Sequence, residues 1–323
     1  MKPPRVSIAC AVLLCVACAH RPAPTPAGFA LHEMDMHLHC GLERPIALDK
    51  WIDISARDGR KVIVMLDHLE LYRKTPAEYD AWLAEKKFPR WYPMGAEGHR
   101  AFNDALDNML MARPDLNLFK GWEIYEGELD TGIEESPMRM ADVIGWHISP
   151  NNGREAPNGQ MLIKRAKQVK ELQKQFPVPM VLFHPFTMRI ENLQKTAKSN
   201  GRDVSTIAVD EYRFFQSGEQ EELARILKGS RIYIEIGKTT GTMWLDPVVR
   251  ESFIKDIKPL AELGVQFTVS TDNHYMIHTQ QKFQPDIYCP ELGITQANTN
   301  SIVRDLLRGT TNGIAARPSL VRP

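Results

Sequence analysis

The sequence has little cysteine and no net charge, and each of these absences excludes a class of protein. Five of its 323 residues are cysteines, and three of those lie within the first eighteen residues. The other two, Cys40 and Cys289, are too few for a disulfide-stapled scaffold, and the sequence leaves open whether they pair. Lysine plus arginine equals aspartate plus glutamate, 40 against 40, so no overall field attracts nucleic acid or an anionic membrane. Charge-driven recognition must therefore be local.

The N-terminal apolar run, VSIACAVLLCVAC, is too short and wrongly flanked for a membrane-spanning helix. It follows Lys2 and Arg5 and resembles a bacterial lipoprotein signal in which Cys18 carries the lipid after cleavage. Cys15 stands where leucine is usual in that pattern, and an ordinary secretory signal is the alternative. We expect residues 1–18 to be a lipoprotein-type signal peptide and residues 19–30 to be a Pro-rich tether. The chain would then be exported, as a periplasmic or outer-membrane lipoprotein that meets the membrane only through Cys18.

The rest of the chain alternates between strand-like and helix-like segments. Seven apolar runs of strand length occupy residues 29–39, 61–68, 116–126, 141–149, 178–186, 231–238 and 265–274. Amphipathic helical patterns lie between several of them, at 159–175, 218–229 and 246–264. This alternation predicts an α/β fold with a parallel sheet. Because no repeat or linker composition follows residue 30, we expect one barrel-like domain over residues 31–323.

Two connections are longer than a compact domain needs. Residues 71–117 are rich in aromatic side chains, and residues 187–218 form the second long connection. Long connections often serve as lids or binding loops. For residues 71–117, a helix that packs its tryptophan and tyrosine side chains onto the barrel wall is an equally good interpretation.

Residues that can bind metal stand at the C-terminal end of every predicted strand. His37 and His39 are two apart on the first strand, so both side chains point to the same face. The later strand ends carry Asp67, His68, Glu123, His147, His184, Glu235, Asp272 and His274. In an α/β barrel these ends converge on the active site. Imidazole and carboxylate groups together suit Zn, Mn or Fe, and there are more of them than one ion can use.

The ordered motifs resemble those of the PHP superfamily, the polymerase and histidinol phosphatase family of metal-dependent phosphoesterases. The motifs are DMHLH, LDH, GWEI, GWHI, FHP, IEI and STDNH, and they span about residues 34–275. The resemblance implies a distorted, TIM-barrel-like (β/α)7 barrel. It also implies a metal-dependent hydrolase that acts on phosphoric esters.

The resemblance implies two or three divalent metal ions, Zn, Mn or Fe, with ligands that can be assigned one by one. The first ion would be held by His37, His39, Glu123 and Asp272, and the second by the bridging Glu123 with His147 and His184. His68 and His274 match ligands of a third ion. That third site lacks the His or Asp that usually follows the H-x-H pair, because Arg44 and Pro45 stand there.

Two metal ions would make hydroxide available from a bound water and neutralise charge on phosphoryl oxygens. The expected reaction is therefore hydrolysis of a small phosphomonoester or phosphodiester. The candidate catalytic groups are Asp67, His68 and His274, and Asp67 and Glu235 are interpreted as groups that orient the histidines. Arg189 and Lys238 are candidate contacts for the substrate phosphate, with a solvated surface role as the alternative.

Two other functions compete with a phosphoesterase. An amidohydrolase-type enzyme that cleaves C–N or ester bonds also has H-x-H on its first strand, but it usually spreads its ligands over eight strands. A metal-binding or ligand-binding lipoprotein without catalysis is the second alternative, and it would not need a bridging carboxylate. We expect a small phosphorylated substrate and no nucleic acid, because no basic stripe follows a phosphate backbone.

Overall fold

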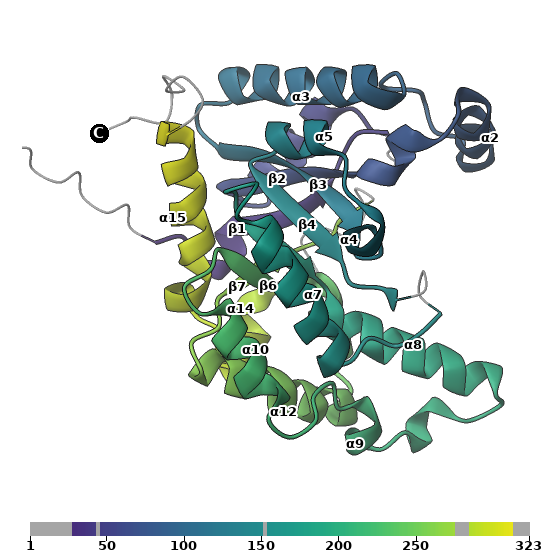
Figure 1. Ribbon diagram of the computed structural model, residues 1–323, viewed down its shortest axis with the longest axis vertical. Coiled ribbons are helices and arrows are strands. Elements are labelled where there is room, and N and C mark those ends of the chain that lie inside the picture. The colour runs from purple at the N-terminus through teal and green to yellow at the C-terminus, as the bar shows by residue number, and fades with distance from the viewer. Residues whose placement is uncertain (1–27, 43–45, 151–153, 275–283, 313–323) are drawn as a thin grey trace, which may run out of the picture.

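The computed structural model describes residues 28–42, 46–150, 154–274 and 284–312, except the side chains of Lys238 and residues 309–312. Its centre is a sheet of seven parallel strands in sequence order (Figure 1). The strands are β1 (Met34–His39), β2 (Val62–His68), β3 (Asn117–Tyr125), β4 (Val143–His147), β5 (Met180–Phe183), β6 (Ile232–Gly237) and β7 (Phe267–Ser270). Each lies within one of the seven predicted runs, which confirms the predicted parallel α/β sheet.

Helices fill every connection between consecutive strands, as parallel pairing requires. They are α1 (Leu48–Arg57), α2 (Pro76–Lys86), α3 (Gly95–Ala112), α4 (Glu128–Thr131), α5 (Glu135–Met140), α7 (Gly159–Leu172), α8 (Pro185–Ser199), α9 (Val209–Tyr212), α10 (Glu219–Leu227), α11 (Lys238–Met243) and α12 (Pro247–Glu262). After β7 come α14 (Pro285–Tyr288) and α15 (Gln296–Asn312). The described residues also form short 3-10 helices, η1 (Leu31–Glu33), η2 (Leu69–Arg73), η3 (Val204–Thr206) and η5 (Pro290–Leu292).

Helix starts follow local signals in the sequence. Thr75 accepts a hydrogen bond from the backbone N–H of Glu78 and so caps α2. Asp246 caps α12 in the same way, and both helices have proline at their first position. The α8 helix also begins with proline, directly after His184, so the end of β5 and the start of α8 are one residue apart.

Most strand residues are buried on both faces of the sheet, and the polar side chains near the C-terminal strand ends point into the barrel. On β3, the Trp122 ring packs outside the barrel against Tyr72, His99 and Phe102. Glu123, its neighbour, points to the opposite face because successive strand side chains alternate. It is 1% exposed. The barrel interior therefore holds a charged group that needs partners.

The sheet nearly closes on itself between its first and last strands. A parallel bridge joins Leu38 of β1 to Asn273, which follows β7, and the His39 N–H donates to the Asn273 carbonyl at 3.2 Å. In Figure 1, α15 runs beside this junction, and it contacts β7. These observations confirm the predicted distorted (β/α)7 barrel.

The long connection over residues 71–117 packs onto the barrel wall. Tyr72 and Tyr79 are both buried, and the Tyr79 hydroxyl donates to the Leu42 carbonyl at 3.2 Å. None of its residues lines the cavity described below. The wall interpretation of this segment therefore fits its described residues better than a lid.

Two further questions left open by the sequence have structural answers. Cys40 and Cys289 are both buried and are not joined by a disulfide. Among the described residues, no helix has the length and apolar character needed to cross a membrane.

Candidate metal centre

Glu123 lies at the middle of the polar cluster inside the barrel, and its two oxygens face different histidines. Three imidazoles surround Oε2. The Nε2 atom of His39 lies 3.0 Å away, and those of His37 and His68 lie 3.2 Å away. These histidines come from the ends of β1 and β2. We call this group of donors the Oε2 side.

The second oxygen of Glu123 faces histidines from β4 and the start of α8. Oε1 lies 2.8 Å from Nδ1 of His147 and 3.3 Å from Nε2 of His184. The two imidazole rings are 4.6 Å apart and nearly perpendicular. We call this group the Oε1 side. A carboxylate with one oxygen directed to each donor set has the arrangement expected of a bridge between two ions.

Asp272 adds a second carboxylate to the Oε2 side. Its Oδ1 atom lies 3.3 Å from Nε2 of His39, 3.6 Å from Nε2 of His37 and 3.3 Å from Nδ1 of His274. This oxygen is buried, and within the described part of the chain it has no hydrogen-bond donor of good geometry. It therefore faces the Nε2 atoms of His37 and His39, which can act as metal ligands.

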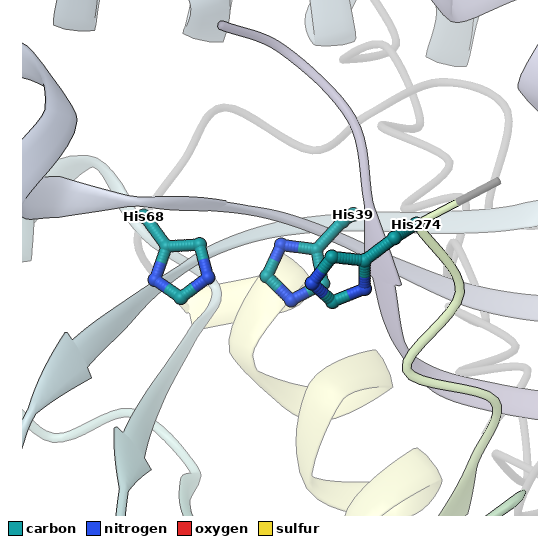
Figure 2. Close-up of side chains that lie close together, drawn as sticks. All are labelled: His39, His68 and His274. Carbon is teal, nitrogen blue, oxygen red and sulfur yellow. The ribbon is translucent and has the colours of Figure 1, made fainter. Parts of the chain in front are cut away.

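Three histidines gather next to the same carboxylates. Figure 2 shows the rings of His68, His39 and His274 in a row, with His39 in the middle. The His39 ring centroid lies 4.7 Å from that of His68 and 4.2 Å from that of His274. His274 donates from Nδ1 to the Asp272 carbonyl at 3.0 Å, which leaves Nε2 as its ligand atom. The structure thus brings His68 and His274 together, as the sequence motifs imply.

Backbone strain is concentrated at two of the candidate ligands. Among the described residues other than glycine, only Lys87, His184 and Asp272 have positive φ, at 58°, 37° and 48°. Such left-handed conformations are disfavoured by the Cβ atom and persist only where surrounding contacts hold them. Two of the three therefore occur where they direct an imidazole and a carboxylate into the cluster.

Glu235 orients ligands from two different strands. Its Oε1 atom accepts hydrogen bonds from Nδ1 of His37 at 2.8 Å and from the Ser270 hydroxyl. Its Oε2 atom accepts the backbone N–H of His184 at 2.8 Å. Glu235 thus makes the contact expected of an orienting group, because a carboxylate that binds one ring nitrogen leaves the other available as a ligand.

The donor set fits a divalent cation. With Nδ1 of His37 donating to Glu235, Nε2 faces the oxygens of Glu123 and Asp272, and a neutral ring would direct its lone pair at them. Acceptors then face acceptors in a buried space, which is unfavourable unless a positive charge lies between them. The same groups form three clusters that could hold an ion, namely His37–His39–Asp272, His37–Glu123–His184 and His39–His68–His274.

The charges within this cluster shift the pKa values of His37 and Glu123. Burial alone would lower the pKa of His37, but Glu235, Glu123 and Asp272 together raise it well above its ordinary value. Burial alone would raise the pKa of Glu123, but His68 and His37 hold it well below the usual range. Glu123 is therefore ionised, and the raised pKa of His37 means that the cluster favours a positive charge at this place, either as a proton on the ring or as a bound cation.

A cavity opens onto the Oε1 side. Its lining consists of His68, Glu123, His147, His184, Thr187, Met188, Glu191, Glu235, Gly237, Thr239, Asp272 and His274. His37 and His39 are not in this lining, and both are 0% exposed. The cavity therefore reaches the Oε1 side through His147 and His184 and the Oε2 side through His68 and Asp272, while the H-x-H pair lies behind it.

Comparisons with known proteins provide evidence about the fold of this chain. No family model matches the chain, and no curated protein matches it. A solved structure does match, that of a histidinol phosphate phosphatase from Lactococcus lactis subsp. lactis Il1403 in complex with zinc, L-histidinol and phosphate. The TM-score is 0.51 at 12% sequence identity, and the match covers 82% of this chain and 95% of that one.

The chain has the fold of this phosphatase. At 12% identity the likeness establishes the architecture and leaves the chemistry to the residues themselves. The PHP-like fold that the sequence motifs imply is thereby confirmed.

Asp67 has a different role from the one predicted. Its Oδ2 atom accepts the Leu42 N–H at 2.7 Å and the Tyr72 hydroxyl at 2.8 Å, and Oδ1 accepts the His68 N–H at 2.9 Å. Asp67 is 0% exposed and does not line the cavity. It therefore holds the backbone after β1 against the end of β2 rather than orienting a histidine ring.

Of the two candidate phosphate contacts, the structure describes the side chain of Arg189 alone. Arg189 donates to the backbone carbonyls of Tyr212, Pro157 and Glu211, at 2.9, 3.1 and 3.1 Å, and does not line the cavity. These contacts correct the prediction that Arg189 binds the substrate phosphate, because its guanidinium instead hydrogen-bonds to neighbouring loops and links α8 to them. The side chain of Lys238 lies outside what the structure describes, as do residues 43–45, which include Arg44 and Pro45.

Sequence reasoning missed the residues of α8 and α11 that line the cavity. Thr187, Met188 and Glu191 lie three, four and seven residues after His184, so they form one face of α8. That spacing was present in the sequence. It could have identified these residues once His184 was placed at the start of a helix.

Proposed function

We propose that the protein is a metal-dependent phosphoesterase that hydrolyses a small phosphomonoester or phosphodiester. The observation that carries this proposal is the position of Glu123, with one oxygen facing His37, His39 and His68 and the other facing His147 and His184. A buried carboxylate between two sets of imidazoles suits a pair of ions and serves no evident packing purpose.

Each ion would have its own set of ligands. His37, His39, Asp272 and Glu123 would hold the first, and Glu123, His147 and His184 would hold the second. When bound, such ions supply an activated water and neutralise charge on phosphoryl oxygens. The chain contributes the alignment of those ligands, since Glu235 fixes the ring of His37 and the backbone of His184. A third ion at His39, His68 and His274 belongs to the same proposal.

A small phosphorylated substrate is supported from two directions. The structural neighbour was crystallised with L-histidinol and phosphate, and with zinc. The cavity is small, about 110 Å³, which suits a compact group at the metal centre. Zinc is the ion that the neighbour supports, and Mn or Fe would suit the same imidazole and carboxylate donors.

The deciding experiment is a metal-reconstituted screen. The full chain, loaded with Zn, Mn or Fe, is assayed against a panel of phosphate esters, with His184→Ala as the control for background hydrolysis. We expect turnover that chelators abolish. If the loaded protein opens lactones or amides and cleaves no phosphate ester, the reaction is that of the amidohydrolase type instead. If it binds metal and turns over none of these, the non-catalytic alternative holds.

We also propose that the protein is exported and anchored through Cys18, which lies outside the described residues. The support is the lipoprotein-type signal and the Pro-rich segment after it. Cys18→Ala should release the protein from membranes or mislocalise it. If fractionation with membranes stays unchanged, the lipid anchor is excluded, and a secretory signal remains.

A further inference from the structure

A buried aspartate next to the metal centre takes no part in the donor set described above. Asp35 lies on β1, two residues before His37, and is 2% exposed. Its Oδ1 atom accepts the backbone N–H of Thr271 at 2.9 Å, and its Oδ2 atom accepts the Thr271 hydroxyl at 2.6 Å. These two residues are 236 positions apart in the sequence. A single carboxylate thus binds the segment after β7 through two hydrogen bonds.

The surroundings of Asp35 explain how a carboxylate persists there. Burial raises the pKa of Asp35, and Arg60, which is 5% exposed, opposes this together with the hydrogen bonds from Thr271 and the His37 N–H, which lies 3.4 Å from Oδ1. A buried carboxylate requires such hydrogen bonds and a compensating charge. Asp35 is therefore a buried, hydrogen-bonded part of the junction between β1 and β7. Because the same junction carries candidate metal ligands, Asp35 can affect the metal centre.

The segment that Asp35 holds carries two candidate ligands. Thr271 directly precedes Asp272, whose φ of 48° is a strained backbone conformation. On the other side of Asp272, the Asn273 carbonyl accepts the His39 N–H at 3.2 Å. Asp272 is therefore held between two attachments to β1. Loss of the first would let the backbone relax and withdraw the carboxylate from His37 and His39.

We propose that Asp35 is a positioning residue for the metal centre. Through Thr271 it holds Asp272 in place, and so it sets the affinity of the ion on the Oε2 side while leaving the ion at Glu123, His147 and His184 unaffected. The proposal rests on the proposed function only in its assignment of these ligands. A purely structural role would instead weaken both ions in parallel with the stability of the fold.

The test measures the affinities of the two ions separately. Full-length wild-type protein and the variants Asp35→Asn, Thr271→Val and Thr271→Ser are titrated with Zn²⁺ in competition with a chromophoric chelator. The bound stoichiometry is then checked by elemental analysis. Substitution with Co²⁺ gives an absorption band that reports the ligands of each ion. Thermal unfolding of each variant without metal monitors the fold.

The matched control is Asp256→Asn. Asp256 is also 2% exposed, and it accepts the Phe214 N–H at 2.8 Å and a hydrogen bond from Arg213 at 2.9 Å, away from the metal centre. This variant should lower the melting temperature and leave both ion affinities as they are in the wild type. It therefore separates the loss of a buried aspartate from the loss of this particular one.

We expect Asp35→Asn to weaken one ion by about 10- to 100-fold and the other by less than about twofold, as for loss of a group that orients a ligand. Thr271→Val keeps the N–H and loses the hydroxyl, so its effect should be smaller, and Thr271→Ser should resemble the wild type. If Asp35→Asn does not fold, Thr271→Val alone must still show the selective loss.

Equal weakening of both ions, or wild-type affinity in Asp35→Asn and Thr271→Val, overturns this inference. Failure of the proposed function is a separate result, namely a wild-type chain that binds two ions and cleaves no phosphate ester. A wild-type chain that binds fewer than two ions overturns both.

Discussion

The two sides of Glu123 are built differently. On the Oε2 side, His37 and His39 are 0% exposed and lie behind the cavity lining. On the Oε1 side, the side chains of His147 and His184 are 17% and 10% exposed, and both line the cavity. One carboxylate therefore joins a partly enclosed donor set, in which the H-x-H pair is buried while His68 and Asp272 reach the cavity, to a set in which both histidines line the cavity.

This difference indicates separate roles for the two sides: the Oε2 side binds its ion tightly, and the Oε1 side presents its ion to the substrate. The partly enclosed side has buried imidazoles, an orienting carboxylate at Glu235 and the attachment at Asp35, all of which favour tight and slowly exchanging binding. The accessible side presents its ion to the cavity, where substrate and water can reach it. We therefore expect the two ions to differ in affinity, with the tighter one on the Oε2 side.

The largest effect should come from removing the group that both sides share. Glu123→Gln should cost both ions together and lower activity by about 10³-fold or more, because the groups that act with Glu123 lose their function as well. Elemental analysis and turnover measure this. Glu219→Gln is the control, since Glu219 is also buried but lies away from the centre. If Glu123→Gln retains one full equivalent of metal, Glu123 does not bridge the two sites.

A smaller and one-sided effect should distinguish His147 from His274. His147→Ala removes a ligand of the accessible ion, so activity should fall by about 10²- to 10³-fold while one equivalent of metal remains. His274→Ala touches only the third site, and activity should fall by about tenfold or less. Both variants are compared at saturating metal. The opposite order of activities would make the third site the essential one.

Glu235 contacts ligands of both sides, so its substitution should weaken both ions moderately. Glu235→Gln should lower each affinity by about 10-fold, because the amide replaces one acceptor oxygen with a donor and cannot serve both His37 and His184. Chelator-competition titration measures the two affinities. Ser270→Ala is the control, because it removes only the hydroxyl that donates to the same oxygen. A change confined to one ion would contradict the shared role.

The smallest effect on the centre should come from Arg189. Arg189→Met removes three hydrogen bonds to backbone carbonyls, so it should lower the stability of the fold by about 1–3 kcal/mol. The KM for a phosphate ester should stay within about twofold of wild type. Thermal unfolding and steady-state kinetics check the two statements. A tenfold rise in KM at unchanged stability would restore Arg189 as a phosphate contact.

The strands and the ligands at their ends could be predicted because both depend on local sequence. An apolar run buried on two faces identifies a strand, and a polar residue at its C-terminal end must point to the site edge of a parallel barrel. His147 and Glu123 needed no further information. The conformations of His184 and Asp272 could not be predicted, because positive φ in these residues is imposed by neighbours and not by the residues themselves.

The remaining contacts depend on helix rotation or on distant partners. Arg189 lies five residues after His184, on a face of α8 different from that of Thr187, Met188 and Glu191, so its place could be predicted only once α8 was known to begin directly after His184. Asp67 binds Leu42 and Tyr72 because the chain turns back after β1. The partners of such buried carboxylates are set by the tertiary fold, so single residues cannot reveal them.

The order of the strands has a consequence for how the chain folds. Each strand pairs with the next in sequence, so six pairings can form step by step with moderate loop-closure entropy, whereas the β1–β7 junction must bring residues 38 and 273 together. The ligands of the Oε2-side ion lie on both sides of that last junction, in β1 and in residues 272–274. The ion on the Oε2 side can therefore be bound by all of its ligands only after the β1–β7 junction has formed. Bound metal should therefore stabilise the closed β1–β7 junction. It should slow unfolding and leave the folding rate nearly unchanged.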